Sequence, residues 1–421
     1  MHVKVYSSIS EIAASEWDSI LGRDAAICSH AYLKAVEASA INDCVYRYPV
    51  VYDEAGYVVA HTCVFSITMD MALFARGAAL AVVRVIRRLF PGFLTIRMLE
   101  CGTPVALGRQ ITLRRGADTG QVLGVLVPAI EAIAHKARLN YLLFRDYRRE
   151  DRAAFDPLTA HGYSPLQNLP EAVLEVRWRS FDAYLADMRS SYRRKVKLNL
   201  ARIADRQITS ALLSDFRHLS GQFVAQWQTI YDNATEYKRE ILTPAFYDNI
   251  NTHLPNARAL VFYEQGKMIA HCLLLYEDDV LRWMYVGKDG AMTEDLYPFM
   301  LYEIVRHAIE AKLRWVKLGI TTYVAKTDLG AEMVPLFMYM KHRTWLFPGL
   351  SPWLFRKMTP LPDLIDKSVF KRAAPSAPAI PHASAQTGCA GQPGRLTQRG
   401  SPGTTGVART TSPHCARWRS A

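Results

Sequence analysis

Paired cysteines are absent from this 421-residue sequence, and their absence narrows the classes of protein to which it can belong. The seven cysteines are scattered and none forms a CxxC pair, so neither a zinc site nor a small disulfide scaffold is indicated. We therefore expect no metal site and a reducing compartment such as the cytoplasm. The first twenty residues lack a basic start followed by an apolar run, so no signal peptide is predicted.

Long apolar runs and familiar hydrolase motifs are missing too. Four arginines interrupt residues 71–94, whereas a membrane-spanning helix needs about 20 mostly apolar residues. We interpret this segment either as a helix packed on its own domain with its arginines outward, or as an amphipathic helix on a membrane surface. GxSxG, HExxH, paired-carboxylate and Cys–His patterns are absent, which leaves hydrolases and metalloenzymes without support.

Acidic residues are missing from the end of the chain. From Lys367 onward there are eight Lys or Arg and no Asp or Glu, so residues 1–366 keep only +4 of the formal charge of +12. Residues 373–421 are mainly Ala, Pro, Ser, Gly and Thr, and cannot bury enough apolar surface to offset the entropy of ordering. We predict a linker and a disordered basic tail over residues 361–421. The folded part is mildly basic, which weakens a nucleic-acid-binding interpretation.

The rest of the sequence has a globular composition, with half of its residues hydrophobic and 21% charged, and its length favours two domains. Both halves show the same order of predicted elements: two helices, an antiparallel meander, a long helix, a strand and a further strand. The closing strands are predicted as a pair within residues 163–178 and as residues 343–347. The sequence therefore predicts an α+β fold with domains over residues 1–178 and 179–360. Each has a mixed, mainly antiparallel sheet flanked by helices.

Residues 181–206 carry the densest positive charge. Seven apolar residues recur there at steps of three or four and predict one continuous helix: Phe181, Leu185, Met188, Tyr192, Val196, Leu200 and Ile203. The cations Arg189, Arg193 and Lys197 lie at steps of four on a neighbouring face, with Arg194 beside them, so that one helical turn of about 6 Å separates successive charges. This spacing suits successive phosphates, although a solvated helix face has the same pattern.

Two loops of the second half are candidate anion sites. Gly287, Lys288 and Gly290 precede a helix that starts near Leu296, where free N–H groups and the helix dipole favour an anion. Lys326 lies in the loop after the strand over residues 314–320. It is suited to bind a phosphate or carboxylate or to stabilise an oxyanion, and the alternative is an exposed loop lysine.

His271, Trp283 and Tyr285 lie on neighbouring strands of the meander over residues 257–289, and we expect them to reach a common cleft. A neutral imidazole at His271 would accept a proton from an amine nucleophile. The alternative is a half-buried strand histidine whose hydrogen bonds are satisfied.

These segments together resemble the Fem-type (FemABX-like) and BioF-associated acyltransferases of the GNAT superfamily over about residues 2–350. The basic helix, the meander, the helix over residues 296–313 and the "AKTDLG" loop are similar to their C-terminal half, and "EWDSILGRDAAICSHAYLKAVEAS" to their N-terminal half. The resemblance implies two tandem GNAT-like domains and acyl transfer to an amine from acyl-CoA or aminoacyl-tRNA. It implies that Lys326 lies near the active cleft, flanked by Gly319 and Gly330. The Q/RxxGxG/A pyrophosphate signature of single-domain GNAT enzymes is missing.

We therefore expect a cytoplasmic N-acyltransferase, in part at the inner face of the membrane, with acyl-CoA as co-substrate and no permanently bound cofactor. Its acceptor would be an amine of a small molecule or a cell-envelope precursor. The expected site residues are Lys326, His271 and Tyr285 for catalysis, Gly287, Lys288 and Gly290 for the donor, and Arg193, Arg194, Lys197, Trp283 and Tyr323 for substrate or phosphate. Two alternatives stay open: a Fem-type aminoacyltransferase that takes its donor from tRNA, and a non-catalytic scaffold that contacts a membrane surface through residues 71–94.

Overall fold

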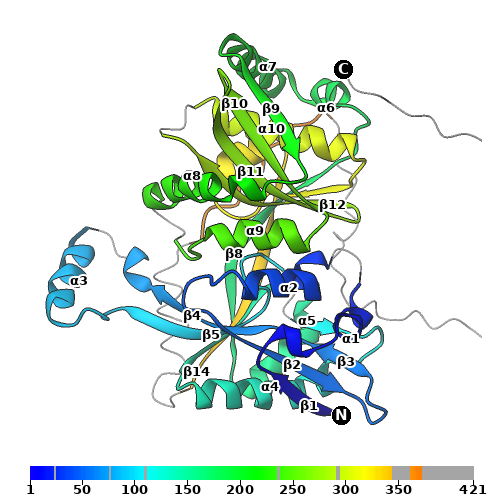
Figure 1. Cartoon of the computed structure of the whole chain (residues 1–421), viewed down its shortest axis with the longest axis vertical. Coiled ribbons are helices and arrows are strands. Elements are labelled where there is room, and N and C mark those ends of the chain that lie inside the picture. Colours follow the sequence, from blue (N-terminus) through cyan, green and yellow to red (C-terminus); the bar gives the residue numbers. More distant parts are fainter. Residues whose placement is uncertain are drawn as a thin grey trace, which may run out of the picture. The chain divides into compact units, whose positions relative to one another are not determined.

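The computed structural model describes residues 1–22, 25–74, 77–108, 111–234, 238–290, 294–343 and 361–371, except for the side chains of residues 73–79. Figure 1 shows the arrangement of its helices and strands. Most of the predicted tail therefore lies outside the described residues. Among the helices that are described, none is both long enough and apolar enough to cross a bilayer.

The first half of the chain contains strands and helices in the predicted order. Its principal elements are β1 (His2–Tyr6), α1 (Ala14–Trp17), α2 (His30–Glu37), β2 (Val45–Tyr52), β3 (Val58–His61), β4 (Val64–Asp70), α3 (Gly77–Leu89), β5 (Thr95–Cys101), β6 (Thr112–Leu113), α4 (Thr119–Lys136), β7 (Tyr141–Tyr147), α5 (Arg152–Phe155) and β8 (Ser164–Glu175). Asp118 caps the long helix α4, because its side chain accepts a hydrogen bond from the backbone N–H of Gln121.

The second half follows the same order. Its elements are α6 (Phe181–Asp187), α7 (Ser190–Asp205), β9 (Ile208–Leu213), α8 (Ser220–Asn233), α9 (Pro244–His253), β10 (Ala257–Glu264), β11 (Lys267–Glu277), β12 (Val280–Lys288), α10 (Leu296–Glu310), β13 (Trp315–Lys317), α11 (Tyr323–Asp328) and β14 (Glu332–His342). Thr243 accepts a hydrogen bond from Phe246 N–H and Pro244 occupies the first turn of α9, an arrangement that favours a helix start.

Each half completes its sheet with a strand that the other half supplies. In the first half β5 runs parallel to β7, and β14 lies antiparallel on the far side of β7. In the second half β12 runs parallel to β13, and β8 lies antiparallel on the far side of β13. Since β8 and β14 also pair with each other, one sheet runs through the described chain in the order β6-β3-β2-β4-β5-β7-β14-β8-β13-β12-β11-β10-β9, with β1 added beside β2.

This exchange changes two predictions about the closing strands. The segment over residues 163–178 is one long strand, β8, rather than a strand pair, because it bonds to β14 along most of its length and to β13 at its end. The last strand is β14, and residues 344–347 of the strand predicted at 343–347 lie outside the described residues. The domain boundary at residue 178 stays a prediction.

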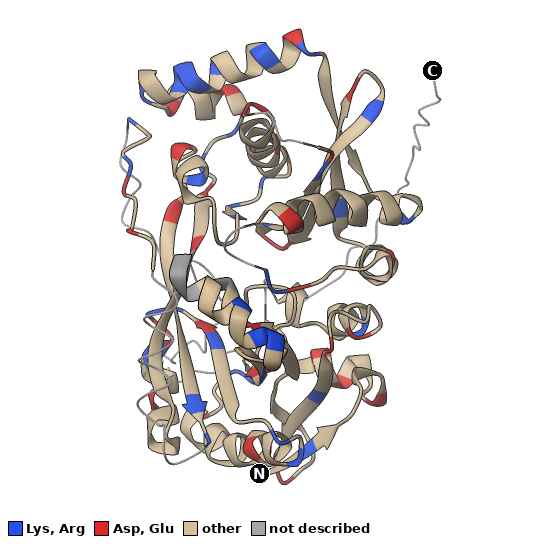
Figure 2. Cartoon of the chain, turned by 90° about the vertical axis from the view of Figure 1, so that its left-hand side faces the viewer, with Lys and Arg blue, Asp and Glu red and all other residues tan. Residues whose placement is uncertain are grey.

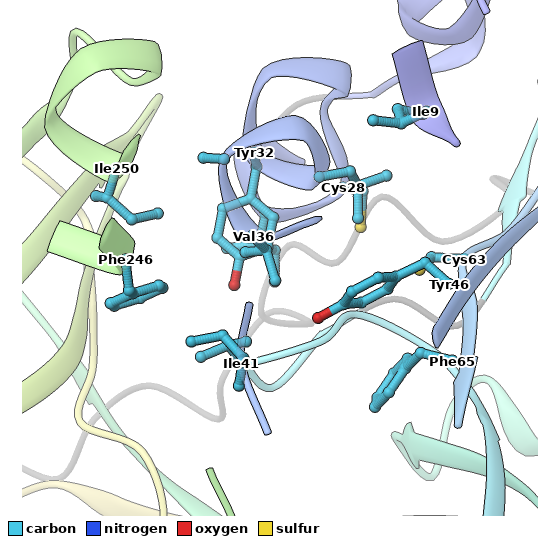
Figure 3. Close-up of a cluster of buried hydrophobic side chains, with 14 of the residues drawn as sticks. Ile9, Cys28, Tyr32, Val36, Ile41, Tyr46, Cys63, Phe65, Phe246 and Ile250 are labelled. Atoms are coloured by element: carbon cyan, nitrogen blue, oxygen red, sulfur yellow. The ribbon is translucent and has the colours of Figure 1, made fainter. Parts of the chain in front are cut away.

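A shared hydrophobic core joins the two halves. Tyr32 and Val36 of α2 are fully buried, as are Phe246 and Ile250 of α9, and Figure 3 shows these side chains on facing helices. Polar contacts cross the same junction, where Thr243 Oγ1 donates to the carbonyl oxygen of Ser39. The two halves are therefore held together by apolar burial on the α2–α9 side of the cavity described below.

The predicted continuous helix over residues 181–206 is wrong, because α6 and α7 are separate. Met188 is extended, with φ of −63° and ψ of 145°, and its backbone bridges to Phe370. Arg189 N–H donates to the carbonyl oxygen of Val369, which is itself 1% exposed. Residues 369–371, predicted to belong to a linker, therefore pack on the second half.

Candidate active site

The main cavity opens where two parallel strands separate. β12 and β13 pair from Val280 opposite Trp315 to Arg282 opposite Lys317, and then β13 ends. Beyond that point Trp283 to Val286 line one side of a cavity of about 830 Å³, and residues 318–322 line the other. The volume is in the range of sites that hold a small-molecule ligand, roughly 300 to 1,000 Å³.

Two backbone irregularities lie on the walls of this cavity. On β12, Trp283 pairs with Leu274 and Tyr285 pairs with Leu273, so Met284 is an extra residue in a β-bulge. A bulge leaves one residue out of the ladder and re-aims the neighbouring side chains. On the opposite wall Thr321 and Thr322 have φ of 72° and 52°, a conformation that is costly for residues with a Cβ and that is concentrated at functional sites.

Lys326 is a buried lysine that lines the cavity, not an exposed loop residue. It lies on the short helix α11, is 3% exposed, and its Nζ donates to the carbonyl oxygen of Ile320 at 3.1 Å. Burial lowers the pKa of Lys326 from its ordinary value of 10.5 to about 7, although the Glu171 carboxylate raises it. The amine is therefore partly neutral near neutral pH and can present a lone pair to a ligand.

Lys317 is a second buried lysine on the cavity wall, at the last paired position of β13. It is 1% exposed, and none of the described residues lies at hydrogen-bond or ion-pair distance from its Nζ. Burial and the neighbouring Arg282 guanidinium lower its pKa to about 8. An unpaired buried lysine costs free energy unless a ligand provides the missing partner.

Glu171 of β8 lies among these cations. Its carboxylate is 3.5 Å from the guanidinium of Arg148 and 4.0 Å from that of Arg282. Arg282 also forms an ion pair with Glu277 at 3.0 Å, and donates to the carbonyl oxygen of Leu107. β8 belongs to the first half of the sequence but pairs with β13 of the second half. The first half therefore supplies the Glu171 carboxylate to the cavity wall.

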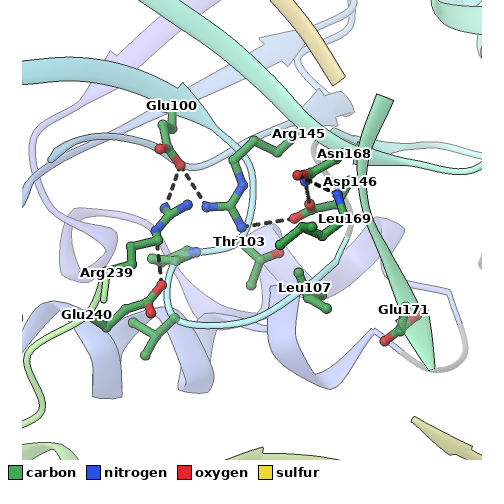
Figure 4. A network of polar contacts seen from close by, with 12 residues as sticks. Glu100, Thr103, Leu107, Arg145, Asp146, Asn168, Leu169, Glu171, Arg239 and Glu240 are labelled. Carbon is green, nitrogen blue, oxygen red and sulfur yellow. Dashed lines mark hydrogen bonds and ion pairs between the residues drawn. The ribbon is translucent and has the colours of Figure 1, made fainter. Parts of the chain in front are cut away.

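A second ionic network lies at the cavity, near the end of the pairing between β5 and β7 (Figure 4). Glu100 accepts hydrogen bonds from Arg145 at 2.8 Å and from Arg239 at 2.5 Å, and all three are less than 9% exposed. Arg239 also forms an ion pair with Glu240 at 3.0 Å. Burial raises the pKa of Glu240 to about 7, and the negative charge of Glu100 adds to this effect.

Charged groups of both signs therefore surround one cavity, with cations in excess. The lining residues include the cations Arg145, Arg239, Arg282, Lys288, Lys317 and Lys326, and the carboxylates Glu171, Glu240 and Glu294. No group of His, Cys, Asp or Glu in the described part of the chain has the arrangement of a metal site. A cavity of this kind suits a polar substrate with an anionic group and leaves two lysines available for proton transfer.

Several predicted residues do meet at this cavity. Trp283, Tyr285, Lys288 and Lys326 all line it, and the Tyr285 hydroxyl donates to the carbonyl oxygen of Val105 at 3.2 Å. Burial lowers the pKa of Lys288. The Tyr323 hydroxyl instead donates to the carbonyl oxygen of Pro170 at 2.9 Å, so this side chain joins α11 to the start of the buried part of β8.

Gly287 and Gly290, the glycines predicted to bind the donor, are not among the residues that line the cavity, whereas Gly319 is. A Cβ at Gly287 would lie 2.3 Å from His271 Cε1 and 2.7 Å from the backbone nitrogen of Trp227, so this glycine allows α8 to pack closely on β12. Gly290 has φ of 55° in the loop after β12, where the absence of a side chain permits the turn.

His271 does not reach the expected cleft. It is completely buried, with Nε2 3.0 Å from the Tyr247 hydroxyl and Nδ1 2.8 Å from Gln226 Oε1, and its ring stacks on Phe223. Burial lowers its pKa to about 3. The side chain thus matches the satisfied strand histidine that was the alternative interpretation.

The basic helix α7 is also separate from the cavity, since none of its residues is among those that line it. Arg193 donates to the carbonyl oxygens of Ala186 and Met188, and Arg202 pairs with Asp295. Arg194 and Lys197 are exposed on the outer face, and Figure 2 shows cations along this helix. Two of its predicted phosphate-binding cations are thus free for a ligand, but at a different surface from the cavity.

Sequence reasoning missed most of the buried charges. Arg145, Glu171, Arg239, Glu240, Arg282 and Lys317 line the cavity but were not predicted. The available signal was a charged residue inside an apolar strand, one each in "VLRWM" and "WVKLG" and an adjacent Arg–Asp pair in "LLFRDY". Such a residue needs a partner or a function, because burying an isolated charge is expensive.

Comparison with known proteins relates this geometry to one family. The FemAB-like family model, described by peptidoglycan biosynthesis and recognition, matches residues 8–322. Proteins from two Mycobacterium tuberculosis strains, both named putative 8-amino-7-oxononanoate synthase 2, are 28% identical over 324 residues. The match covers 74% of this chain but only 42% of the relatives' length.

Solved structures show the same fold at low sequence identity. The C-terminal domain of a putative lysylphosphatidylglycerol synthetase from Agrobacterium fabrum has a TM-score of 0.50 and 11% identity, and the match covers 82% of this chain and 95% of that domain. FemX has a TM-score of 0.50 and 11% identity, with 80% of this chain and 97% of FemX covered. These likenesses show the fold alone, an α+β fold in which a mixed sheet is flanked by helices.

Proposed function

The chain belongs to the FemAB-like family, and from this premise we propose that it transfers an acyl group from an acyl-CoA donor to the amine of a cell-envelope or other small precursor. Family and fold support the coarser statement, an acyl- or aminoacyl-transferase. The donor and the acceptor amine are our proposal.

The separation of β12 from β13 is the observation that carries the proposal. From Trp283 onward the edge of β12 is no longer paired with β13 and faces the cavity. An extended chain that contains amide groups, such as the pantetheine arm of CoA, can add to such an edge by backbone hydrogen bonds. The bulge at Met284 lies on this unpaired stretch of β12 and re-aims its side chains at the cavity wall.

Lys326 is suited to receive the proton of the attacking amine. Its neutral form donates one N–H to Ile320 and keeps a lone pair for the substrate. In the proposed step the acceptor nitrogen attacks the thioester carbonyl carbon, a C–N bond forms, and the C–S bond breaks. The proton lost by the amine passes to Lys326 and then to the leaving thiolate, so the products are an amide and free CoA thiol.

The cations that line the cavity would hold the substrate in place. Lys317 has no partner among the described residues, so an anionic group of the acceptor would balance its positive charge and fix the position of the amine. Positioning of two reactants at reaction distance can supply roughly 7 to 11 kcal/mol of the barrier, so little further catalytic machinery is needed.

The test is thiol release from a panel of acyl-CoA donors with amine acceptors that do or do not carry a carboxylate or phosphate. We expect thiol release that needs both donor and acceptor, and an acyl-CoA that stays bound to the protein in native mass spectrometry. Absence of both binding and release across the panel would argue against the proposal.

A parallel experiment distinguishes the aminoacyl-tRNA donor. Binding of tRNA should weaken steeply as salt increases if the cations of α7 contact phosphates. If the protein transfers an aminoacyl group from charged tRNA, and the Arg194→Gln/Lys197→Gln variant loses this transfer, then the donor is aminoacyl-tRNA and not acyl-CoA. Activity with acyl-CoA that is unchanged in this variant would support the proposal, because neither residue lines the cavity.

A further inference from the structure

A projecting lobe carries a surface that the proposed function does not use. We define this α3 lobe as residues 80–93, which comprise most of α3 and the turn that follows it, at the ends of β4 and β5. Figure 1 shows α3 standing away from the rest of the chain. None of the residues that line the cavity lies in this lobe, so the proposed transfer step gives the lobe no role.

One side of the lobe is fixed to its own hairpin. Arg87 forms an ion pair with Asp70, with Nη1 2.8 Å from Oδ2, and its Nε donates to the carbonyl oxygen of Phe93. Val83 is 6% exposed and packs on the same side. The hairpin also closes through the backbone, where Met71 N–H donates to the carbonyl oxygen of Leu94. These contacts hold α3 in a definite orientation.

The opposite side exposes large apolar side chains. Within twelve residues the exposed fractions are 57% for Val82, 60% for Val85, 79% for Leu89, 66% for Phe90 and 37% for Phe93. Val82, Val85 and Leu89 share one helix face, since they are spaced by three and four residues. Exposed apolar residues are common singly, but a contiguous group on a projecting helix indicates a binding surface.

The charges beside this face identify what it binds. Arg84 and Arg88 are exposed and lie four residues apart, on the face that adjoins the apolar one. The sequence between Asp70 and Glu100 contains no acidic residue. Two copies of this face would bring like charges together, whereas an anionic lipid surface would receive the apolar side chains and attract the arginines.

We infer that the α3 lobe docks this protein on anionic membrane surfaces, with Val85, Leu89 and Phe90 in the interface and Arg84 and Arg88 on the lipid headgroups. The lobe lies on the surface and does not cross the bilayer, because its helix is short and charged. An acyl acceptor that is itself at the membrane would then be brought close to the cavity, which is the only part of this inference that rests on the proposed function.

Flotation with vesicles tests the inference on the full chain. We expect the protein to float with vesicles that contain about one-third phosphatidylglycerol, and not with pure phosphatidylcholine, since the attraction is electrostatic. Binding should decrease when ionic strength rises from about 0.1 M to about 1 M, because the Debye length falls from about 10 Å to about 3 Å.

Three variants separate the contribution of the apolar side chains to lipid binding from that of the arginines. Val85→Asp/Leu89→Asp should abolish flotation, and Arg84→Gln/Arg88→Gln should weaken it by about fivefold for each arginine removed. Leu198→Asp is the matched control, because Leu198 is 50% exposed on the equally basic helix α7 and should float like the wild type. All four proteins should keep the same melting temperature.

Two outcomes would overturn the inference. Equal flotation of the Val85→Asp/Leu89→Asp variant and the wild type would show that lipid is bound elsewhere or not at all. If the wild type sediments as a dimer without lipid and the Val85→Asp/Leu89→Asp variant sediments as a monomer, the face binds a second copy of the chain instead. Loss of transferase activity with intact flotation would contradict the proposed function alone.

Discussion

The Nζ atom of Lys326 lies 5.5 Å from the centre of the Trp283 ring, so a buried amine rests over an aromatic face on the cavity wall. The ring favours the charged form of the lysine, whereas its burial favours the neutral form. Burial outweighs the attraction of the Glu171 carboxylate and lowers the pKa of Lys326 to about 7. The protonation state of this residue therefore changes within the physiological pH range.

Removal of the Lys326 amine should abolish proton transfer while the fold persists. We predict that Lys326→Met lowers kcat/KM by about 10² to 10⁴, the usual contribution of general acid–base catalysis. In the wild type kcat/KM should rise with pH up to about 7 and then level off, because only neutral Lys326 accepts a proton. Initial rates between pH 5 and 9 on thiol release measure both effects.

The Lys326→Arg variant separates catalysis from charge. Arginine keeps the positive charge but does not become neutral, so this variant should be as inactive as Lys326→Met. Exposed Lys197 is the control, and Lys197→Met should leave the pH profile unchanged. An active Lys326→Arg variant would mean that the residue binds an anion and does not act as a base.

Replacement of Lys317 should increase the stability of the unliganded protein. Its pKa is about 8 in the folded chain against an ordinary value of 10.5, so the folded state is destabilised by up to about 3 kcal/mol at 1.4 kcal/mol per pKa unit. This cost is complete below pH 8 and disappears as pH rises to about 10.5, because only then does the unfolded chain also lose the proton. Wild-type stability should therefore rise with pH in this interval.

Urea unfolding of Lys317→Met at several pH values tests this prediction. The variant should be more stable than the wild type at pH 7, and the difference should shrink as pH approaches 10. A variant that is less stable at pH 7 would show that Lys317 has a favourable partner in the folded chain. Weaker protection of the variant by a phosphate-bearing acceptor would link the same residue to substrate binding.

The sequence predicted local elements well because their signals are local. The meander predicted over residues 257–289 follows from the alternation of apolar and polar residues, and the structure confirms it as β10, β11 and β12. The family resemblance was confirmed too. The spacing of apolar residues over 181–206 could not show the break at Met188. This break depends on a backbone contact with Phe370, which is far away in the sequence.

The exchanged strands explain why much of the site could not be predicted. Glu171 is far from Lys317 and Lys326 in sequence and reaches them only because β8 pairs with β13. Arg145 and Arg239 meet through Glu100, which lies on a third segment. The role predicted for His271 relied on its strand position alone. The packing of α8 instead places Gln226 and Phe223 against the His271 ring, so the ring does not reach the cavity.

The close packing of α8 on β12 should depend on Gly287. A Cβ at this position would lie 2.3 Å from His271 Cε1, 2.7 Å from Trp227 N and 2.8 Å from Gln226 Cβ. We predict that Gly287→Ala destabilises the protein by about 1 to 3 kcal/mol, as other overpacked sites do. Thermal unfolding measures the change. Gly221→Ala, in α8 itself with open space around it, is the control and should be neutral or up to about 1 kcal/mol stabilising.

The Glu100 carboxylate neutralises two arginines that line the cavity, so Glu100→Gln should affect both stability and a neighbouring pKa. Arg145 keeps Asp146 as a partner and Arg239 keeps Glu240, but each loses its bond to a buried negative charge. We predict a loss of about 3 kcal/mol in the free energy of unfolding, at the lower end for a broken buried ion pair. Asp215→Asn breaks the exposed pair with Arg217 and should leave stability unchanged.

The same Glu100→Gln substitution should lower the pKa of Glu240 from its value of about 7, because the charge of Glu100 is one of the two influences that raise it. Carboxyl-carbon NMR of glutamate-labelled protein follows this titration directly. A lower Glu240 pKa together with reduced stability would show that Glu100 acts through its charge. Reduced stability with an unchanged Glu240 pKa would mean that the substitution disturbs packing around β5, and that Glu240 is tuned by burial alone.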